Sequence, residues 1–348
     1  MSWLLICDKN RSREAGKTTR REHLLAHGTL VIEVDQAVER RPCKRLVRYA
    51  NDTGWQHGFT VFANPDGSIA VEHQQGHSKS YARVSKASNE RGRARISYSW
   101  DGPERIGTLT LECLETDAFR QAIFRNPLPL PMRDARALIL GAKKGEHDPA
   151  VEAMALSDRW ERVGPAPTIA AGTLVDTPDG PRPIQTLQLG DLVTTRSHGD
   201  QKIRWILRGQ RPNVGFDRAS RVHAPALGLE ADLTTTGRQR LELPYDQVQQ
   251  VLGEDIATLE SNALTHVSEP VSGLSQPYFQ LLLDMHDCIR LNGIWAEATY
   301  IGRLGDATNA LAGTWFSSLT RYALPRHGSR VAPQIEKRNP TLMAQLTA

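Results

Sequence analysis

The stretch 168-TIAAGTLVDTPDGPRPI-184 decides the fold of the second half of the chain. Its apolar and β-branched residues run to Asp176, and the turn residues Pro178, Asp179 and Gly180 follow at once. Further turn signals lie at Gly190-Asp191 and in the run SHGD that begins at Ser197. Short strands bounded by turns at this spacing predict a β-meander that begins at about residue 172.

Three later segments extend this block. Residues 245–262 are acidic and have helical spacing, and they predict a helix. Asn292-Gly293 predicts a tight hairpin turn between two apolar runs, because both residues tolerate a positive φ. Residues 307–323 predict a C-terminal helix that ends before Pro325.

The first half of the chain has the pattern of strands and turns between residues 28 and 126. The run NPDG at 64–67 separates two alternating segments and has the residue types of a hairpin turn. Ile96, Tyr98 and Trp100 alternate with polar residues, so they share one face of a predicted strand. Several short strands at near-regular spacing predict an antiparallel β-sandwich.

The run Gly164-Pro165-Ala166-Pro167 is the clearest domain boundary in the chain. The fold class is therefore mostly β, with an N-terminal antiparallel sandwich, a second β-domain and a C-terminal helix. In chain order we expect a flexible basic arm (1–21), the sandwich (22–140), a linker (141–165), the second β-domain (166–305), and a C-terminal helix and tail (306–348).

Composition excludes several classes of protein. The 348 residues carry 43 Lys plus Arg against 39 Asp plus Glu, and a net charge of +4 gives no argument for a nucleic-acid partner. The four cysteines form no CxxC pair, which indicates neither a disulfide framework nor a zinc ribbon. No apolar run approaches the ~20 residues of a transmembrane helix. Without a classical export signal, we expect a cytoplasmic or non-classically secreted protein with no cofactor and no metal.

The second block resembles a known family. Residues 168–184 look like the opening of a bacterial Hint (hedgehog/intein) domain, and residues 188–193 and 203–206 continue that opening. Residues 278–297, which include His286, resemble the closing motif of the same domains. The resemblance covers about 166–305 and implies a Hint-like β-fold.

The resemblance also implies where the chemistry would lie. Family members begin with a cysteine that attacks the preceding carbonyl, and Thr168 stands at that position. A histidine in the middle motif protonates the departing nitrogen, and the run 232–240 offers Arg238 or Gln239 instead. Neither side chain can donate and recover a proton near neutral pH. Only His286, in the closing motif, keeps a catalytic residue type, and a structural hydrogen-bonding role for it stays equally open.

These departures from the family pattern imply a Hint-like domain that has lost autoprocessing and acts as a binding or presentation module. Its partner would be an unidentified protein or glycan. One alternative is self-cleavage, in which Thr168 performs an N–O acyl shift at Pro167–Thr168 with help from His286. Protein splicing is not expected, because the chain contains no His-Asn dipeptide.

A glycan-binding, lectin-like sandwich is the other alternative. Residues 96–101 and 108–111 weakly resemble strands of concanavalin-like or laminin-G-like sandwiches, which bind glycans or proteins. Trp55 lies in a predicted loop, where it would either stack on a sugar or anchor the loop.

Two histidine pairs have the i, i+4 spacing of metal ligands on a helix. They are His23 with His27, and His73 with His77. Neither pair carries the glutamate of an HExxH motif, so we interpret all four as surface histidines.

Overall fold

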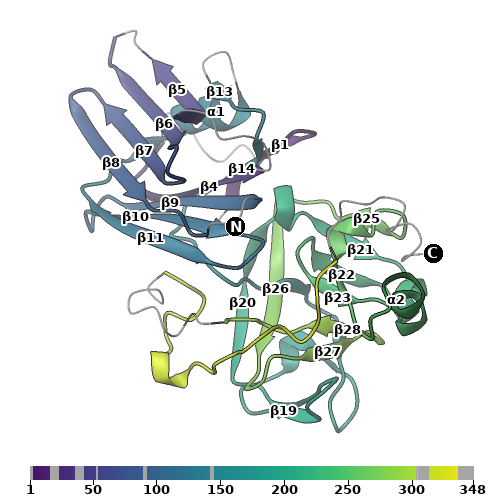
Figure 1. Ribbon diagram of the computed structural model, residues 1–348. Helices are drawn as coiled ribbons and strands as arrows, with labels where there is room; N and C mark the ends of the chain where they lie inside the picture. Colours follow the sequence, from purple (N-terminus) through teal and green to yellow (C-terminus); the bar gives the residue numbers. More distant parts are fainter. Residues whose placement is uncertain are drawn as a thin grey trace. The chain divides into compact units, whose positions relative to one another are not determined.

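The computed structural model describes residues 3–15, 23–35, 43–51, 54–88, 92–141, 145–302, 304 and 313–335. The chain divides into two compact units, Met1–Gly164 and Pro165–Ala348. The division falls inside the proline-rich run 164–167. Both units are built mainly from antiparallel sheets, as predicted, and the described residues contain two α-helices (Figure 1).

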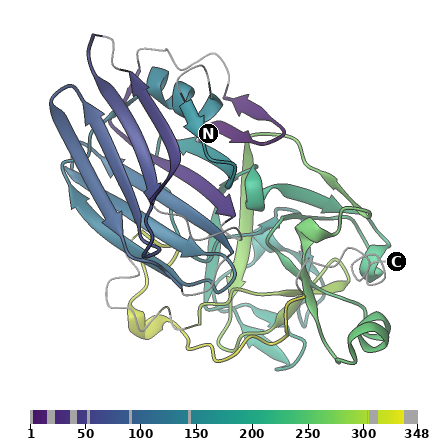
Figure 2. The same cartoon turned by 45° about the horizontal axis from the view of Figure 1, so that its top comes forward.

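The first unit is a sandwich of two antiparallel sheets, which confirms the predicted architecture (Figures 1 and 2). The seven-stranded sheet has the spatial order β11 (Phe119–Arg125), β10 (Ile106–Cys113), β9 (Arg93–Asp101), β4 (His27–Asp35), β14 (Val151–Ser157), β1 (Trp3–Asp8) and β2 (Ser12–Glu14). The five-stranded sheet has the order β13 (Gly145–His147), β5 (Lys44–Asn51), β6 (His57–Ala63), β7 (Ile69–Gln75) and β8 (Ser78–Val84). A short ladder of β3 (Leu24–Leu25) and β12 (Leu130–Pro131) precedes α1 (Met132–Leu140).

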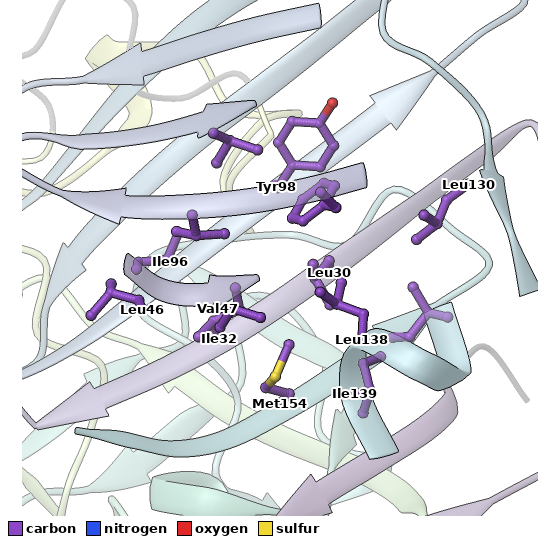
Figure 3. Packing of buried hydrophobic residues seen from close by; sticks show 14 of the residues in the cluster. Leu30, Ile32, Leu46, Val47, Ile96, Tyr98, Leu130, Leu138, Ile139 and Met154 are labelled. Atoms are coloured by element: carbon purple, nitrogen blue, oxygen red, sulfur yellow. The ribbon is translucent and has the colours of Figure 1, made fainter. Parts of the chain in front are cut away.

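One apolar cluster fills the space between these sheets. Ile96, Tyr98 and Trp100 of β9 are all buried, as their alternation predicts. Tyr98 is the centre of an aromatic group, since the rings of Phe59 and Phe124 lie 5.3 and 5.2 Å from its own. Figure 3 shows side chains of β4, β5, β9, β14 and α1 within this cluster.

Polar contacts fix α1 against the five-stranded sheet. Asp134 of α1 is buried, and its carboxylate lies 2.8 Å from Nδ1 of His57 in β6. The Tyr49 hydroxyl donates to the same carboxylate at 3.0 Å. Because the carboxylate contacts side chains of both β5 and β6, the helix has a defined position on the sheet.

The two segments expected to lie outside the sandwich contain four of its strands, β1 and β2 in the arm and β13 and β14 in the linker. The pairing of β1 with β14 shows this most clearly. β1 lies inside the expected flexible arm, 1–21, and β14 lies inside the expected linker, 141–165. The two strands pair with each other, and β14 also pairs with β4, so both boundaries are corrected. The apolar run of β1 is short and is followed by basic residues, which are typical of a mobile arm. Its partner, β14, is too distant in the chain for a local pattern to indicate the pairing. Residues 16–22 of the expected arm lie outside the described residues.

The second unit contains two six-stranded sheets. The first has the order β20 (Trp205–Pro212), β26 (Ser275–Leu282), β15 (Ile169–Ala170), β22 (Leu233–Thr236), β21 (Ala219–Val222) and β25 (Ser268–Pro270). The second has the order β17 (Arg182–Pro183), β16 (Leu174–Val175), β27 (Cys288–Leu291), β28 (Ile294–Glu297), β23 (Arg240–Glu242) and β24 (Thr258–Glu260). A hairpin of β18 (Leu192–Thr194) and β19 (Asp200–Lys202), and α2 (Tyr245–Leu252), complete the regular structure. Short 3-10 turns lie at Ile184–Thr186, Gly215–Asp217, Ala226–Gly228, Ser261–Ala263 and Arg321–Ala323.

The predictions for this unit differ in their outcomes. Asn292-Gly293 forms the expected hairpin turn between β27 and β28, with φ angles of +45° and +99°. The helix expected over 245–262 ends at Leu252, because Gly253 adopts a left-handed cap with φ +69°. Of the helix expected over 307–323, residues 307–312 lie outside the described residues, and 313–323 form turns.

His73 is not the surface histidine expected from its spacing to His77. Its side chain is 2% exposed, and its ring lies 5.3 Å from that of Phe59 in the sandwich interior. Burial lowers the pKa of His73 to about 4, and the nearby His57 adds to the shift. His77, in contrast, is exposed at the β7–β8 turn.

Acid should therefore destabilise the sandwich through His73. Its folded-state pKa lies below the unfolded value, so stability present above about pH 6.5 is lost as the pH falls through about 4. The pKa shift corresponds to roughly 3 kcal/mol of the free energy of unfolding. We expect His73→Gln to flatten the pH dependence of the urea unfolding midpoint between pH 6.5 and 4. His77→Gln is the matched control and should leave the slope unchanged; an unchanged slope in His73→Gln would contradict the assignment.

Candidate functional site

Thr168 lies near the start of the second unit, directly before β15. Its N–H donates to the carbonyl of Phe279 in β26 at 3.2 Å, and its carbonyl accepts from Thr236 in β22 at 2.8 Å. The backbone is therefore held from both sides, and β15 continues between the same two strands. This pairing brings the opening, middle and closing motifs together at one residue.

The Thr168 hydroxyl lies between two carboxamides. Oγ1 donates to Oε1 of Gln239 at 2.5 Å and accepts from Nε2 of Gln280 at 3.0 Å. The same Nε2 lies 3.0 Å from Oε1 of Gln239, which closes a triangle of polar atoms. Carboxamides do not titrate, so neither partner can take the hydroxyl proton.

Backbone groups set the orientation of both carboxamides. Nε2 of Gln239 donates to the carbonyls of Arg240 and Glu297 at 2.9 and 3.0 Å, which turns its oxygen toward Thr168. Oε1 of Gln280 accepts from the N–H of Leu281 at 3.0 Å, which leaves its amino group for the site. Gln239 and Gln280 are 2% and 5% exposed. The cluster is a buried, mutually satisfied network.

These contacts distinguish the two middle-motif candidates. Gln239 bonds directly to Thr168, whereas Arg238 is its neighbour in the connection between β22 and β23. Sequence reasoning missed Gln280. It is the one polar residue within the apolar run 278–283, and a lone polar residue in a buried strand needs a partner.

His286 has different partners. It is 6% exposed, and its Nδ1 accepts from the N–H of Val331 at 3.1 Å. Its neutral ring therefore carries the proton on Nε2, an atom with no hydrogen-bond partner in the described part of the chain. Burial lowers the pKa of His286 to about 3, with further contributions from Arg330 and His327. Among the described residues, no hydrogen bond joins His286 to Thr168.

His286 and Asp287 lie in the connection between β26 and β27, not in a strand, and the hydrogen bonds of the Asp287 carboxylate go to residues other than His286. One carboxylate oxygen, Oδ2, accepts from Nδ1 of His198 at 2.7 Å and from the N–H groups of Ser197 and His198. The other, Oδ1, accepts from the N–H of Cys288. Asp287 is fully buried and anchors the 197–198 loop to the start of β27.

In the first unit, Trp55 is 66% exposed. Its ring lies against Gly76 in the β7–β8 turn, where a Cβ atom would stand 2.5 Å from the indole. Tyr81 of β8 is also exposed, at 56%. Trp55 thus rests on the turn and still offers ring surface to solvent.

The described residues contain neither a metal-binding cluster nor a helix suited to cross a membrane. No three His, Cys, Asp or Glu side chains there gather closely enough to hold a metal ion. None of the helices described has both the length and the apolar character that crossing a membrane requires.

Some solved structures have local likeness to this chain. The CBM40 domain of the Ruminococcus gnavus IT-sialidase, bound to α2,3-sialyllactose, is 15% identical over 38% of this chain and 75% of its own, with a TM-score of 0.28. A splice-inactive variant of the AceL NrdHF class 3 split intein is 11% identical over 38% of this chain and 99% of its own, also with a TM-score of 0.28.

A protein-family model gives the firmer result. No curated protein matches the sequence. The model described as "Hint domain" matches residues 167–303, beginning one residue before Thr168 and extending past the closing motif. Its span coincides with the sheets that converge on Thr168, and residues 167–303 are therefore a Hint domain.

Proposed function

We propose that the Hint domain of this chain does not autoprocess and serves as a folded binding or presentation module. The observation that carries the proposal is the hydrogen bonding of the Thr168 hydroxyl, which donates to Gln239 and accepts from Gln280. An N–O acyl shift needs a group that removes the hydroxyl proton. It also needs a group that protonates the departing nitrogen of Thr168.

Among the described residues, the hydrogen-bond partners of Thr168 supply neither group. The N–H of Thr168 donates to the Phe279 carbonyl, which has no proton to return. His286 is neutral near pH 7, since its pKa lies at about 3, and its acceptor nitrogen is engaged by Val331. The Pro167–Thr168 bond is therefore expected to persist.

The intact mass of the protein tests this directly. We expect a single species near 38.7 kDa after prolonged incubation at pH 7, with and without hydroxylamine or dithiothreitol. These nucleophiles would capture an ester or thioester at residue 167. Fragments that meet at Pro167–Thr168 would overturn the proposal.

Restoring the missing groups should restore cleavage. In Thr168→Cys with Gln239→His, a thiol replaces the hydroxyl and an imidazole takes the place of the carboxamide. A positioned proton-transfer group contributes about 10²–10⁴-fold in rate, so we expect thiol-dependent cleavage on a denaturing gel. The matched control, Thr168→Cys with Arg238→His, should stay intact. Cleavage in the control alone would move the middle-motif role to Arg238, and an intact first variant would contradict the role given to Gln239.

A second candidate function, glycan binding by the first unit, is favoured by Trp55. An indole ring that rests on Gly76 and stays two-thirds exposed offers a flat apolar face beside polar loop groups. Aromatic rings with such exposure are enriched at binding surfaces. The sequence resemblance to lectin-like sandwiches points to the same class of ligand.

A glycan array probed with the full chain tests this candidate. For any glycan that binds, Trp55→Ala should weaken binding at least tenfold, which is about 1.4 kcal/mol of lost contact. Tyr322→Ala removes another exposed aromatic residue, in the second unit, and should have no effect. A blank array for the unaltered chain removes glycan binding as a candidate.

A further inference from the structure

Residues 326–335 cross the Hint domain as an irregular, extended segment, which we call the strap. It follows Pro325 and contains Pro333, and both prolines disfavour a helix. Although much of it lacks regular structure, three sets of contacts fix it to the domain. His327 and Ala332 are buried as a result, at 5% and 3% exposure.

The end of the strap extends a sheet. β24 is the last strand of its sheet, so one edge is open to pairing. Gln334 forms a parallel bridge with Thr258 of β24. The N–H of Thr258 donates to the Pro333 carbonyl, and the N–H of Ile335 donates to the Thr258 carbonyl, both at 2.9 Å. Peptide ligands commonly add a strand to an exposed sheet edge in this way.

The middle of the strap is anchored by Arg330. Its Nη1 donates to Oε2 of Glu297 at 2.6 Å, and its guanidinium lies 4.2 Å from the centroid of the Tyr300 ring. A charge-assisted hydrogen bond to a buried carboxylate is stronger than a neutral one. Stacking on Tyr300 adds a cation–π contact. Next to it, the N–H of Val331 donates to His286.

The start of the strap is held by its own side chains and carbonyls. The Tyr300 hydroxyl donates to the Gly328 carbonyl at 2.9 Å. Nδ1 of His327 accepts from the N–H of Ile301 at 3.3 Å, and its Nε2 donates to the Leu283 carbonyl at 3.1 Å. The start, the middle and the end of the strap are therefore each bound to the domain by polar groups. These groups would lose a hydrogen-bond partner if the strap left the domain surface.

The domain surface beneath the strap consequently has the properties of a peptide site. It offers a sheet edge at Thr258, a buried carboxylate at Glu297, an aromatic ring at Tyr300 and an acceptor at His286. Nε2 of His286 is a further buried donor that the strap leaves unpaired. An unused buried donor at an occupied site indicates capacity for another acceptor.

We propose that this surface is a peptide-binding groove and that the strap is its built-in, exchangeable occupant. The groove accepts, from a second chain, an extended peptide with an arginine followed by small aliphatic residues. This proposal rests on the binding role proposed above and names a peptide as the ligand class. The intact-mass measurement tests the loss of autoprocessing separately. A tethered occupant has a millimolar effective concentration, so the groove is closed until the strap is weakened.

The probe for this proposal is a fluorescein-labelled synthetic peptide with the sequence of residues 325–335, followed by fluorescence anisotropy. The full-length Arg330→Ala chain should bind it at least tenfold more tightly than the unaltered chain, whose strap competes. The same peptide carrying Arg330→Ala should not bind. Arg326→Ala is the matched control, since Arg326 is an exposed strap arginine, and it should leave the groove closed.

Folding of the Arg330→Ala chain is checked in the same sample. Arg240 remains 3.5 Å from Glu297, so this carboxylate keeps a cation, and the core amides of Leu281 and Ile289 should stay protected from hydrogen exchange. If those amides lose protection in Arg330→Ala, the binding measurement is made with Arg330→Lys instead. Lysine keeps the positive charge but lacks the planar group that stacks on Tyr300. Folded protein that binds the peptide no better than the unaltered chain, or equally well with the alanine peptide, would overturn the proposal.

Discussion

The backbone pairing of Thr168 and Ile169 between β22 and β26 is the constraint on which the Hint domain depends. Three segments far apart in the sequence meet there, and main-chain hydrogen bonds hold them. Such bonds make no demand on side-chain chemistry. Residue 168 is therefore positioned by its main chain, whatever side chain it carries.

The polar cluster at Thr168 is made of groups that carry no charge near pH 7. A catalytic centre keeps groups whose protonation changes, and such groups are costly to bury. Thr168, Gln239 and Gln280 instead satisfy one another with neutral groups at any pH near 7. Nε2 of His286, a buried donor without a hydrogen-bond partner in the described part of the chain, lies elsewhere, beneath the strap. On the function we propose, the lost chemistry and the peptide site would belong to separate parts of one domain.

Local sequence patterns predicted the features that depend on local physics. The Asn292-Gly293 turn, the β9 alternation and the opening motif all follow from residue types a few positions apart. Non-local features were not predictable in this way. Gln280 carries no local signal of the residue it faces, and the place of β14 is decided by partners more than a hundred residues away.

The pairing of β14 with both β4 and β1 has a consequence for how the first unit forms. β14 lies inside the seven-stranded sheet but is the last of its strands to be synthesised. The sheet therefore cannot be completed until residues 151–157 have left the ribosome. Until then β1 and β4 present open edges to other chains. A fragment cut at residue 140 would keep that exposed state permanently, and the smallest unit that can complete its own core runs from Trp3 to Ser157.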